Sequence, residues 1–168
     1  KRLRGIVFLG GHFTHSEDKL KQISVPFVLS TVGPLEDDHK KKYVAVSIDD
    51  VKESGKMVEY LIENGHKQIA ILTAREDDES IGYLRVSGYQ KALKKHGIPV
   101  QPSLIRYTWE GLPAYTMESG YALTQKLLES GEKFTAIFAI SDRMAVGACK
   151  AIFDSGKRVP EDYSVVGF

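Results

Sequence analysis

Residues 136–168 read AIFAISDRMAVGACKAIFDSGKRVPEDYSVVGF, and this stretch decides the fold class. A nearly continuous apolar run at residues 136–140 leads into a segment that Gly156 and Pro160 end as a helix. The apolar residues at helical spacing are Met144, Ala148, Ala151 and Ile152. A second apolar run closes the stretch at residues 164–168. Runs of this kind are typical of parallel strands covered on both faces, so the stretch predicts strand, helix and parallel strand.

The same alternation extends over the rest of the chain. Further strands are predicted at residues 6–9, 26–31, 44–48, 68–73 and 104–107. Amphipathic helices are predicted between them, ended by Gly65 and Gly97. Their predicted inward residues are Val51, Val58, Leu61 and Ile62, then Val86, Tyr89, Ala92 and Leu93, then Tyr121, Leu127 and Leu128 within residues 118–130. Alternating strands and helices indicate an α/β fold with parallel sheets and helices on both faces.

The composition is that of an ordinary globular protein. The 168 residues carry a formal net charge of +1, with 42% hydrophobic and 27% charged residues. A near-neutral balance predicts no nucleic-acid surface in this chain. One cysteine, Cys149, excludes an internal disulfide framework, and no apolar run approaches the roughly 18 residues of a membrane span. Because the predicted strands begin and stop close to the two ends, we expect structured flanks beyond them.

In open parallel sheets, ligands bind beyond the carboxyl ends of the strands. That rule selects residues 10–16, 49–50, 74–85, 108–115 and 141–143. In these segments Arg85 offers a fork of donors, Tyr115 and Trp109 offer flat faces, and acceptors for hydroxyl groups are also present. The acceptors are Asp49, Ser141 and Asp142. This mixture suits a small, neutral, hydroxyl-rich ligand.

Each of these residues also has a purely structural interpretation. Ser141 or Asp142 can cap the helix that follows the strand, and Asp49 or the next residue can cap another. Tyr115 can staple a helix start, and Arg85 can be an ordinary surface charge. From position alone, these alternatives stay open.

Catalytic and metal-binding patterns are weak. No nucleophile elbow or complete phosphate-binding loop is present, and His12 and His15 lack the further ligands of a metal site. We therefore expect neither an enzyme nor a bound metal or cofactor.

Five motifs, taken together, resemble the effector-binding cores of LacI/GalR transcriptional regulators. They are GHKQIA at residues 65–70, RVSGYQKAL at 85–93, ESGY at 118–121, FAISDRMAVGA at 138–148 and GKRVPEDYSVVGF at 156–168. The resemblance implies a periplasmic-binding-protein-like fold of type I, with a partial first lobe at residues 1–50, a second lobe at 51–168 and a ligand cleft between them. It places the helix-turn-helix DNA-binding domain outside this chain.

The resemblance also implies roles for particular residues. Arg85 takes the position of the effector-binding arginine, Tyr115 that of an aromatic residue packed on the ligand, and Ser141 that of a polar residue reaching the effector. Asp142 lies beside it, and Asp49 matches an acidic residue at the lobe crossover. Residues 108–114 form a longer loop than is usual, so that Trp109 can replace or join Tyr115.

The implied protein is a cytoplasmic, ligand-responsive regulator, more often a repressor, with no membrane contact. It would bind a small effector such as a sugar, form a homodimer and reach operator DNA through its N-terminal domain. The alternative is a periplasmic sugar-binding protein of a transporter or chemoreceptor.

Overall fold

The computed structural model describes residues 3–9, 22–30, 44–78 and 81–168. The chain divides into two compact units. Unit 1 comprises Lys1–Asp49 and Glu79–Ile81, and unit 2 comprises Asp50–Asp78 and Gly82–Phe168. None of the described helices is long and apolar enough to cross a membrane.

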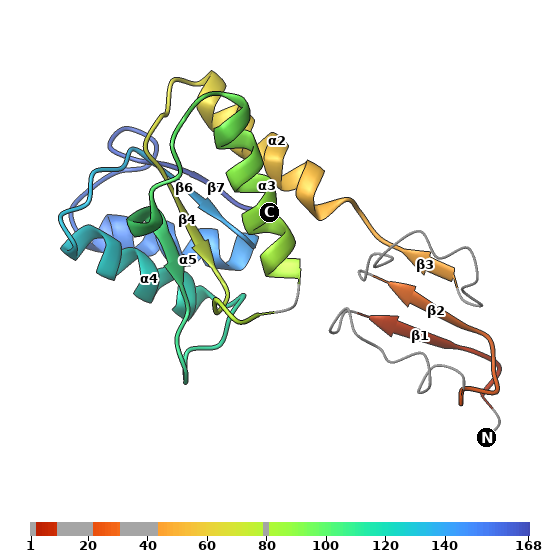
Figure 1. Cartoon of the computed structure of the whole chain (residues 1–168). Helices are drawn as coiled ribbons and strands as arrows, with labels where there is room; N and C mark the ends of the chain where they lie inside the picture. Colours follow the sequence, from red (N-terminus) through yellow and green to blue (C-terminus); the bar gives the residue numbers. More distant parts are fainter. Residues whose placement is uncertain (1–2, 10–21, 31–43, 79–80) are drawn as a thin grey trace. The chain divides into compact units, whose positions relative to one another are not determined.

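Unit 1 contains a parallel sheet of three described strands, in the order β1-β2-β3 (Figure 1). The strands are β1 (Ile6–Leu9), β2 (Phe27–Ser30) and β3 (Val44–Val46). Val7, Val28 and Val44 stand in register across them, and the side chains of Val7 and Val44 are exposed. Leu29, on the opposite face, is buried.

Unit 2 is built on a parallel sheet with the strand order β5-β4-β6-β7. The strands are β4 (Ile69–Thr73), β5 (Ile105–Tyr107), β6 (Ala136–Ala139) and β7 (Ser164–Val166). Every residue of the two central strands, β4 and β6, is buried. The continuous apolar runs of the sequence therefore mark strands covered on both faces, as predicted.

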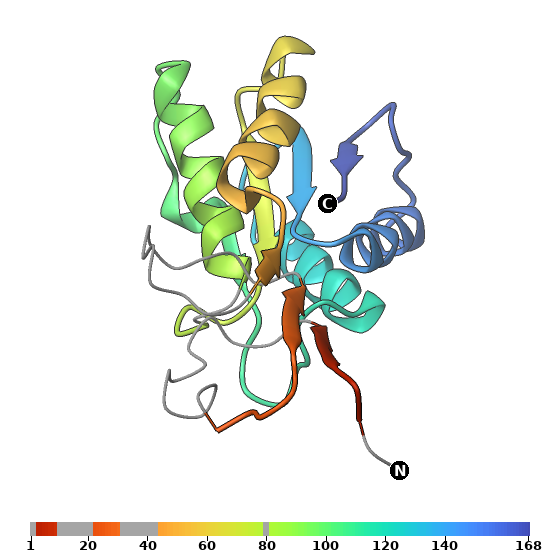
Figure 2. The same cartoon turned by 90° about the vertical axis from the view of Figure 1, so that its right-hand side faces the viewer.

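Four helices flank this sheet: α2 (Asp50–Glu63), α3 (Ile81–Lys95), α4 (Met117–Glu129) and α5 (Asp142–Asp154). Figures 1 and 2 show α2 and α3 on one face and α4 and α5 on the other. The core lies on both sides of β4 and β6, where its largest fully buried side chains include Tyr89, Phe138, Leu127 and Met144. The predicted α/β fold with helices on both faces of a parallel sheet is confirmed.

The predicted helix ends are also confirmed. Gly65 has a φ of 92°, and the N–H of the following His66 donates to the carbonyl of Leu61 at 3.1 Å. Gly97 has a φ of 68° and ends α3 in the same way. Both glycines adopt a left-handed conformation that other residues reach only with strain, which explains why the helices stop there.

Tyr121 lies differently from its predicted inward position. It is only half-buried, and its hydroxyl donates to the carboxylate of exposed Asp154 at 3.1 Å. Leu127 is buried as predicted, Leu128 is partly buried against the core, and Leu123 and Thr124 add to the inward face of α4. Tyr121 has a polar tip, and the neighbouring α5 offers that tip a partner at the surface.

Helices α4 and α5 cross at two glycines. A methyl group at Gly120 would overlap the carbonyl oxygen of Met144, and one at Gly147 would overlap that of Met117. The backbones approach each other closely because neither glycine carries a side chain. This crossing fixes the start of α5, and with it the residues that follow β6.

Candidate functional site

Arg85 joins several elements at the carboxyl edge of the unit 2 sheet. It lies on α3 and is 8% exposed. Its Nε donates to Oδ1 of Asp50 at 2.8 Å, and its Nη2 lies 2.8 Å from the same oxygen. Its Nη1 donates to the carbonyl oxygen of Ile140 at 2.5 Å, and the ring centroid of Phe168 lies 3.6 Å from the guanidinium carbon. Arg85 thereby connects the start of α2 with the ends of β6 and β7.

The guanidinium keeps donors beyond these contacts. It carries five N–H groups, two each on Nη1 and Nη2. The contacts with Asp50 and Ile140 occupy at most one on each nitrogen, so Nη1 and Nη2 each keep one for a further acceptor. The buried charge itself is neutralised, because Asp50 is also buried. The site therefore offers fixed donors with little net charge.

The acidic residue that pairs with Arg85 is Asp50, the neighbour of the predicted ligand contact Asp49. Asp50, not Asp49, begins α2, is 5% exposed and pairs with Arg85. Asp49 is exposed and belongs to unit 1, and its contact with a ligand stays a prediction. The sequence shows two adjacent acids before a helix, but only the approach of α3 determines which one becomes buried. Phe168 was missed for the same reason.

Ser141 is the residue that caps α5. Its backbone is extended, with φ −153° and ψ 152°, and its Oγ accepts a hydrogen bond from the N–H of Met144 at 3.3 Å. The hydroxyl hydrogen can still be donated. Asp142 is the first helical residue and is exposed, and its N–H donates to the carbonyl of Phe168 at 3.1 Å. The capping role predicted for one of the pair thus belongs to Ser141, and the carboxylate of exposed Asp142 lies next to Gly167.

Tyr115 is held in an uncommon backbone conformation next to α3. Its φ is 63°, a left-handed value that is rare for a bulky side chain. Its hydroxyl donates to Oδ2 of Asp78 at 3.3 Å, and a methyl group at Gly82 would lie 2.8 Å from the Tyr115 hydroxyl. Gly82 and Arg85 are one turn apart on one side of α3. The structure thus brings Tyr115 to within one helical turn of Arg85.

Trp109 lies elsewhere on the same sheet edge. It follows β5, an edge strand, whereas the contacts of Arg85 lie at β6 and β7, with β4 in between. The Nζ of Lys126 lies 3.6 Å from the Trp109 ring centroid. The structure does not bring Trp109 together with the residues around Arg85.

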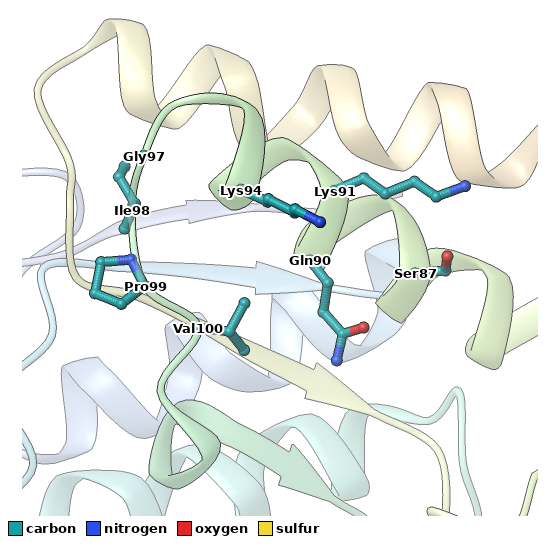
Figure 3. Close-up of a pocket in the computed structure, with 8 residues that line it drawn as sticks. All are labelled: Ser87, Gln90, Lys91, Lys94, Gly97, Ile98, Pro99 and Val100. Atoms are coloured by element: carbon teal, nitrogen blue, oxygen red, sulfur yellow. The ribbon is translucent and has the colours of Figure 1, made fainter.

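The outer side of α3 carries a groove of about 610 Å³ (Figure 3). Its walls are one face of α3 and the turn at Gly97 and Pro99. Figure 3 shows Gln90 and Val100 beside the hollow, with the side chain of Lys91 extending away from the turn. This groove lies at the carboxyl end of α3, toward the amino ends of the strands. Its position argues against a role as the primary ligand site, since ligands bind at the other edge.

Within residues 3–9, 22–30, 44–78 and 81–168, no group of three or more His, Cys, Asp and Glu side chains could hold a metal ion. His12 and His15, with the rest of residues 10–16, lie outside the described residues.

Comparison with known proteins places this geometry in a family. The sequence profile of a periplasmic binding protein-like domain matches residues 58–168, which is most of unit 2. The chain belongs to the periplasmic-binding-protein-like family. A curated relative in this group is the HTH-type transcriptional regulator MalR of Clostridium butyricum, which is 41% identical over 169 residues. That alignment covers 100% of this chain and 49% of MalR.

Solved structures of the periplasmic-binding-protein-like family have the same fold. A sugar-binding transcriptional regulator of the LacI family from Escherichia coli, complexed with phosphate, has a TM-score of 0.81 and 32% identity, over 99% of this chain and 57% of its own. The complex of the transcriptional regulator CelR with cellobiose has a TM-score of 0.80 and 30% identity, over 98% and 48% of the two chains.

These matches confirm the resemblance to the cores of LacI/GalR regulators and the fold that it implied. The chain spans about half the length of the curated relatives it matches. MalR is named as a transcriptional regulator, and ExuR of Bacillus subtilis as a probable transcriptional repressor.

Proposed function

We propose that this chain is the effector-binding core of a transcriptional regulator, most simply a repressor, whose effector is a neutral sugar. The observation that carries the proposal is the buried guanidinium of Arg85, fixed at the carboxyl ends of β6 and β7 with two N–H groups left to donate. Vicinal hydroxyls present acceptor oxygens at a spacing that such a fork matches. The chain is proposed as a binding protein, not an enzyme, in line with the names of its relatives.

The neighbouring groups support a neutral, hydroxyl-rich ligand. The Arg85 charge is matched by Asp50, so the pair supplies no excess positive charge for a phosphate. Tyr115, one turn of α3 away, offers a flat apolar face, and exposed Asp142 offers acceptors for hydroxyl hydrogens. CelR, whose structure this chain resembles, was solved with a disaccharide.

Effector binding would control DNA binding by favouring one arrangement of the protein over another. A ligand shifts such an equilibrium only by its difference in affinity for the two states. The DNA contact is assigned to a part of the cytoplasmic protein outside this chain, as the helix-turn-helix names of its relatives indicate. Paired DNA half-sites require a two-fold protein, so the regulator is proposed to act as a homodimer.

The outer face of α5 supports the homodimer. Val146 and Phe153 are 56% and 54% exposed and lie seven residues apart, on one face of the helix. Met117, at the start of the adjoining α4, is 46% exposed. Several exposed apolar side chains on one side of a helix pair favour a protein interface. Phe153→Glu should shift the sedimentation coefficient to that of a monomer, and Tyr60→Glu on α2 should not. A dimer unaffected by Phe153→Glu would exclude this face.

The effector site is tested by substitutions that preserve the charge. A thermal-shift screen of neutral mono- and disaccharides identifies the ligand, and calorimetry then measures its affinity. Arg85→Lys keeps a cation for Asp50 but loses the planar fork, so affinity should fall at least about tenfold. Arg158→Lys, an exposed arginine paired with Asp162, is the matched control and should leave affinity unchanged. An Arg85→Lys protein that binds the sugar as tightly as the unsubstituted protein would remove Arg85 from the site.

A further inference from the structure

A second hollow lies at the carboxyl ends of β4 and β5, away from Arg85. Residues 75–77, after β4, and residues 107–110, at and after the end of β5, line it, and Figure 1 shows the ends of these two strands at the same end of the sheet. Its volume is about 500 Å³. We call it the Trp109 groove, and its lining residues are Arg75, Glu76, Asp77, Tyr107, Thr108, Trp109 and Glu110. A volume of this order accommodates a small molecule.

The indole of Trp109 supplies a platform in this groove. It is 39% exposed, although tryptophan is usually more deeply covered. The Nζ of Lys126 on α4 lies 3.6 Å from the ring centroid, so a cation occupies one face and restricts the ring orientation. The opposite face can stack on the apolar side of a sugar ring. A ligand cation would meet the nearby Lys126 charge.

The polar groups of the groove include both acceptors and donors. Arg75 donates from Nε and Nη2 to both carboxylate oxygens of Asp77, at 2.8 and 2.7 Å. Glu76 and Glu110 add further carboxylates, so the lining carries more negative than positive charge and repels anions. Burial, with a smaller effect from the carboxylate of Glu76, raises the pKa of Tyr107. Its hydroxyl therefore stays protonated and able to donate.

Thr108 contributes a buried hydroxyl without a partner. The residue is 5% exposed, and its Oγ1 makes no hydrogen bond within the described part of the chain. Its backbone N–H continues the sheet by donating to Thr73 at 3.1 Å. A buried hydroxyl left unpaired lowers stability by roughly 1–3 kcal/mol. A ligand hydroxyl that pairs with it would gain affinity from removing that penalty.

We propose that the Trp109 groove is a second carbohydrate site, which takes the ring of a neutral sugar. The sugar stacks on the indole, donates hydroxyl hydrogens to Glu76 and Glu110, and pairs with the hydroxyl of Thr108. The site is separate from the proposed effector site, because it lies at β4 and β5 and uses none of the residues around Arg85.

The chain offers its own probe of this site. Trp109 is the single tryptophan in the sequence, so tryptophan emission reports on the groove. Glucose, maltose and cellobiose are titrated separately into the protein, with spermidine as a cationic control. We expect a saturable change in emission with at least one sugar and none with spermidine. The same titration of Arg85→Lys should keep this response, even where calorimetry shows loss of the effector.

Two threonine substitutions separate a ligand contact from a structural effect. Thr108→Val removes the groove hydroxyl and should raise the dissociation constant read from Trp109 about three- to tenfold. Thr124→Val removes another buried hydroxyl without a partner, on α4 and outside the groove lining, and should not change it. Neither should lower thermal stability, because each replaces an unpaired polar group by an apolar one of similar shape.

Three results would overturn the second site. One is the absence of a saturable change with all three sugars, and another is a response to spermidine alone. The third is a response that disappears in Arg85→Lys but is unchanged in Thr108→Val, because emission would then report only the effector site. If Arg85→Lys leaves sugar affinity in calorimetry unchanged while the Trp109 response is intact and weakened by Thr108→Val, the result counts against the proposed function alone.

Discussion

Arg85 on α3 and Asp50 at the start of α2 form an ion pair whose side chains are only 10% and 5% exposed. The two residues are 35 positions apart in the sequence, and their contact holds two helices over the ends of β6 and β7. Arg85 therefore has a structural role beside its proposed ligand contact. A buried charge without its partner strongly destabilises the folded protein, whereas the removal of both charges destabilises it much less.

That asymmetry gives a prediction for unfolding experiments. Asp50→Ala and Arg85→Ala should each lower the free energy of unfolding in urea by about 3–5 kcal/mol. The double variant should lose clearly less than the sum of the two, because neither charge is stranded. Additive losses would show that the pair is not coupled in solution. Arg75→Ala, which removes an exposed arginine paired with Asp77, should leave stability nearly unchanged, because water screens an ion pair at the surface.

The crossing of α4 and α5 makes Gly147 a sensitive position. Gly147→Ala places a methyl group against the backbone of Met117, which cannot rotate away. We expect a loss of about 3 kcal/mol or more, at the upper end of overpacking effects. Gly55→Ala is the control, because its methyl would lie 3.6 Å from the carbonyl oxygen of Gly88, an ordinary contact. Within α2 it should stabilise by about 0.5–1 kcal/mol, as measured by thermal or urea unfolding.

The sequence predicted the local elements of unit 2 well because their signals are local. Buried parallel strands are apolar throughout, and Gly65, Gly97 and Gly156 occupy left-handed positions just after helices. The site was harder to predict because its geometry is not local. Whether Asp49 or Asp50 becomes buried depends on the approach of α3, and Trp109 is separated from Arg85 by the strand order, which places β5 at the edge. The sequence left either Ser141 or Asp142 as the cap of α5, and the extended backbone of Ser141 identifies it as the cap.

His66 connects the amino ends of three strands. Its Nδ1 lies 2.9 Å from Oγ1 of Thr135, and its Nε2 lies 3.0 Å from Oγ of Ser164, where β7 begins. A hydroxyl can donate or accept, so either neutral ring tautomer satisfies both contacts. His66→Ala should lower stability by about 1–2 kcal/mol through the two lost bonds. Hydrogen exchange of the β7 amides should quicken, while sugar affinity, measured at the other sheet edge, should stay the same.

The proposed contact between Tyr115 and the sugar can be tested by a substitution on α3, next to the Tyr115 hydroxyl. Gly82→Ala adds a methyl group 2.8 Å from the Tyr115 hydroxyl and 2.9 Å from Oδ2 of Asp78, so the ring must shift. We expect sugar affinity in calorimetry to fall about tenfold, since a contact on a flat face depends on its position. Tyr115→Phe keeps the ring and removes the hydroxyl that donates to Asp78, so its effect should be smaller. Equal affinity in Gly82→Ala and the unsubstituted protein would argue that Tyr115 does not touch the ligand.

Glu59 on α2 should make the stability of the folded state depend on pH in the acid range. A hydrogen bond from Lys95 Nζ, 2.7 Å from Oε1, holds the pKa of Glu59 below its ordinary value of 4.5, although partial burial opposes the shift. His96, 3.8 Å from the same oxygen, adds a smaller effect in the same direction. The pKa of Glu59 is lower in the folded than in the unfolded protein. Ionised Glu59 therefore stabilises the folded state fully above the unfolded pKa of 4.5, and this stabilisation is lost as pH falls through the folded-state pKa.

Glu59→Gln should therefore make stability less dependent on pH below about 4.5, with a loss at neutral pH of less than about 1 kcal/mol for a pair at the surface. Urea unfolding between pH 3 and 7 measures both quantities. Glu63→Gln, one turn further along the same helix, is the control, because Glu63 has no ion pair among residues 44–78 and 81–168. If the free energy of unfolding falls equally steeply below pH 4.5 in Glu59→Gln and in the unsubstituted protein, Lys95 does not bind this carboxylate in solution. Lys95→Met, which removes the hydrogen-bond donor to Glu59, should weaken the pH dependence of stability below pH 4.5 in the same way.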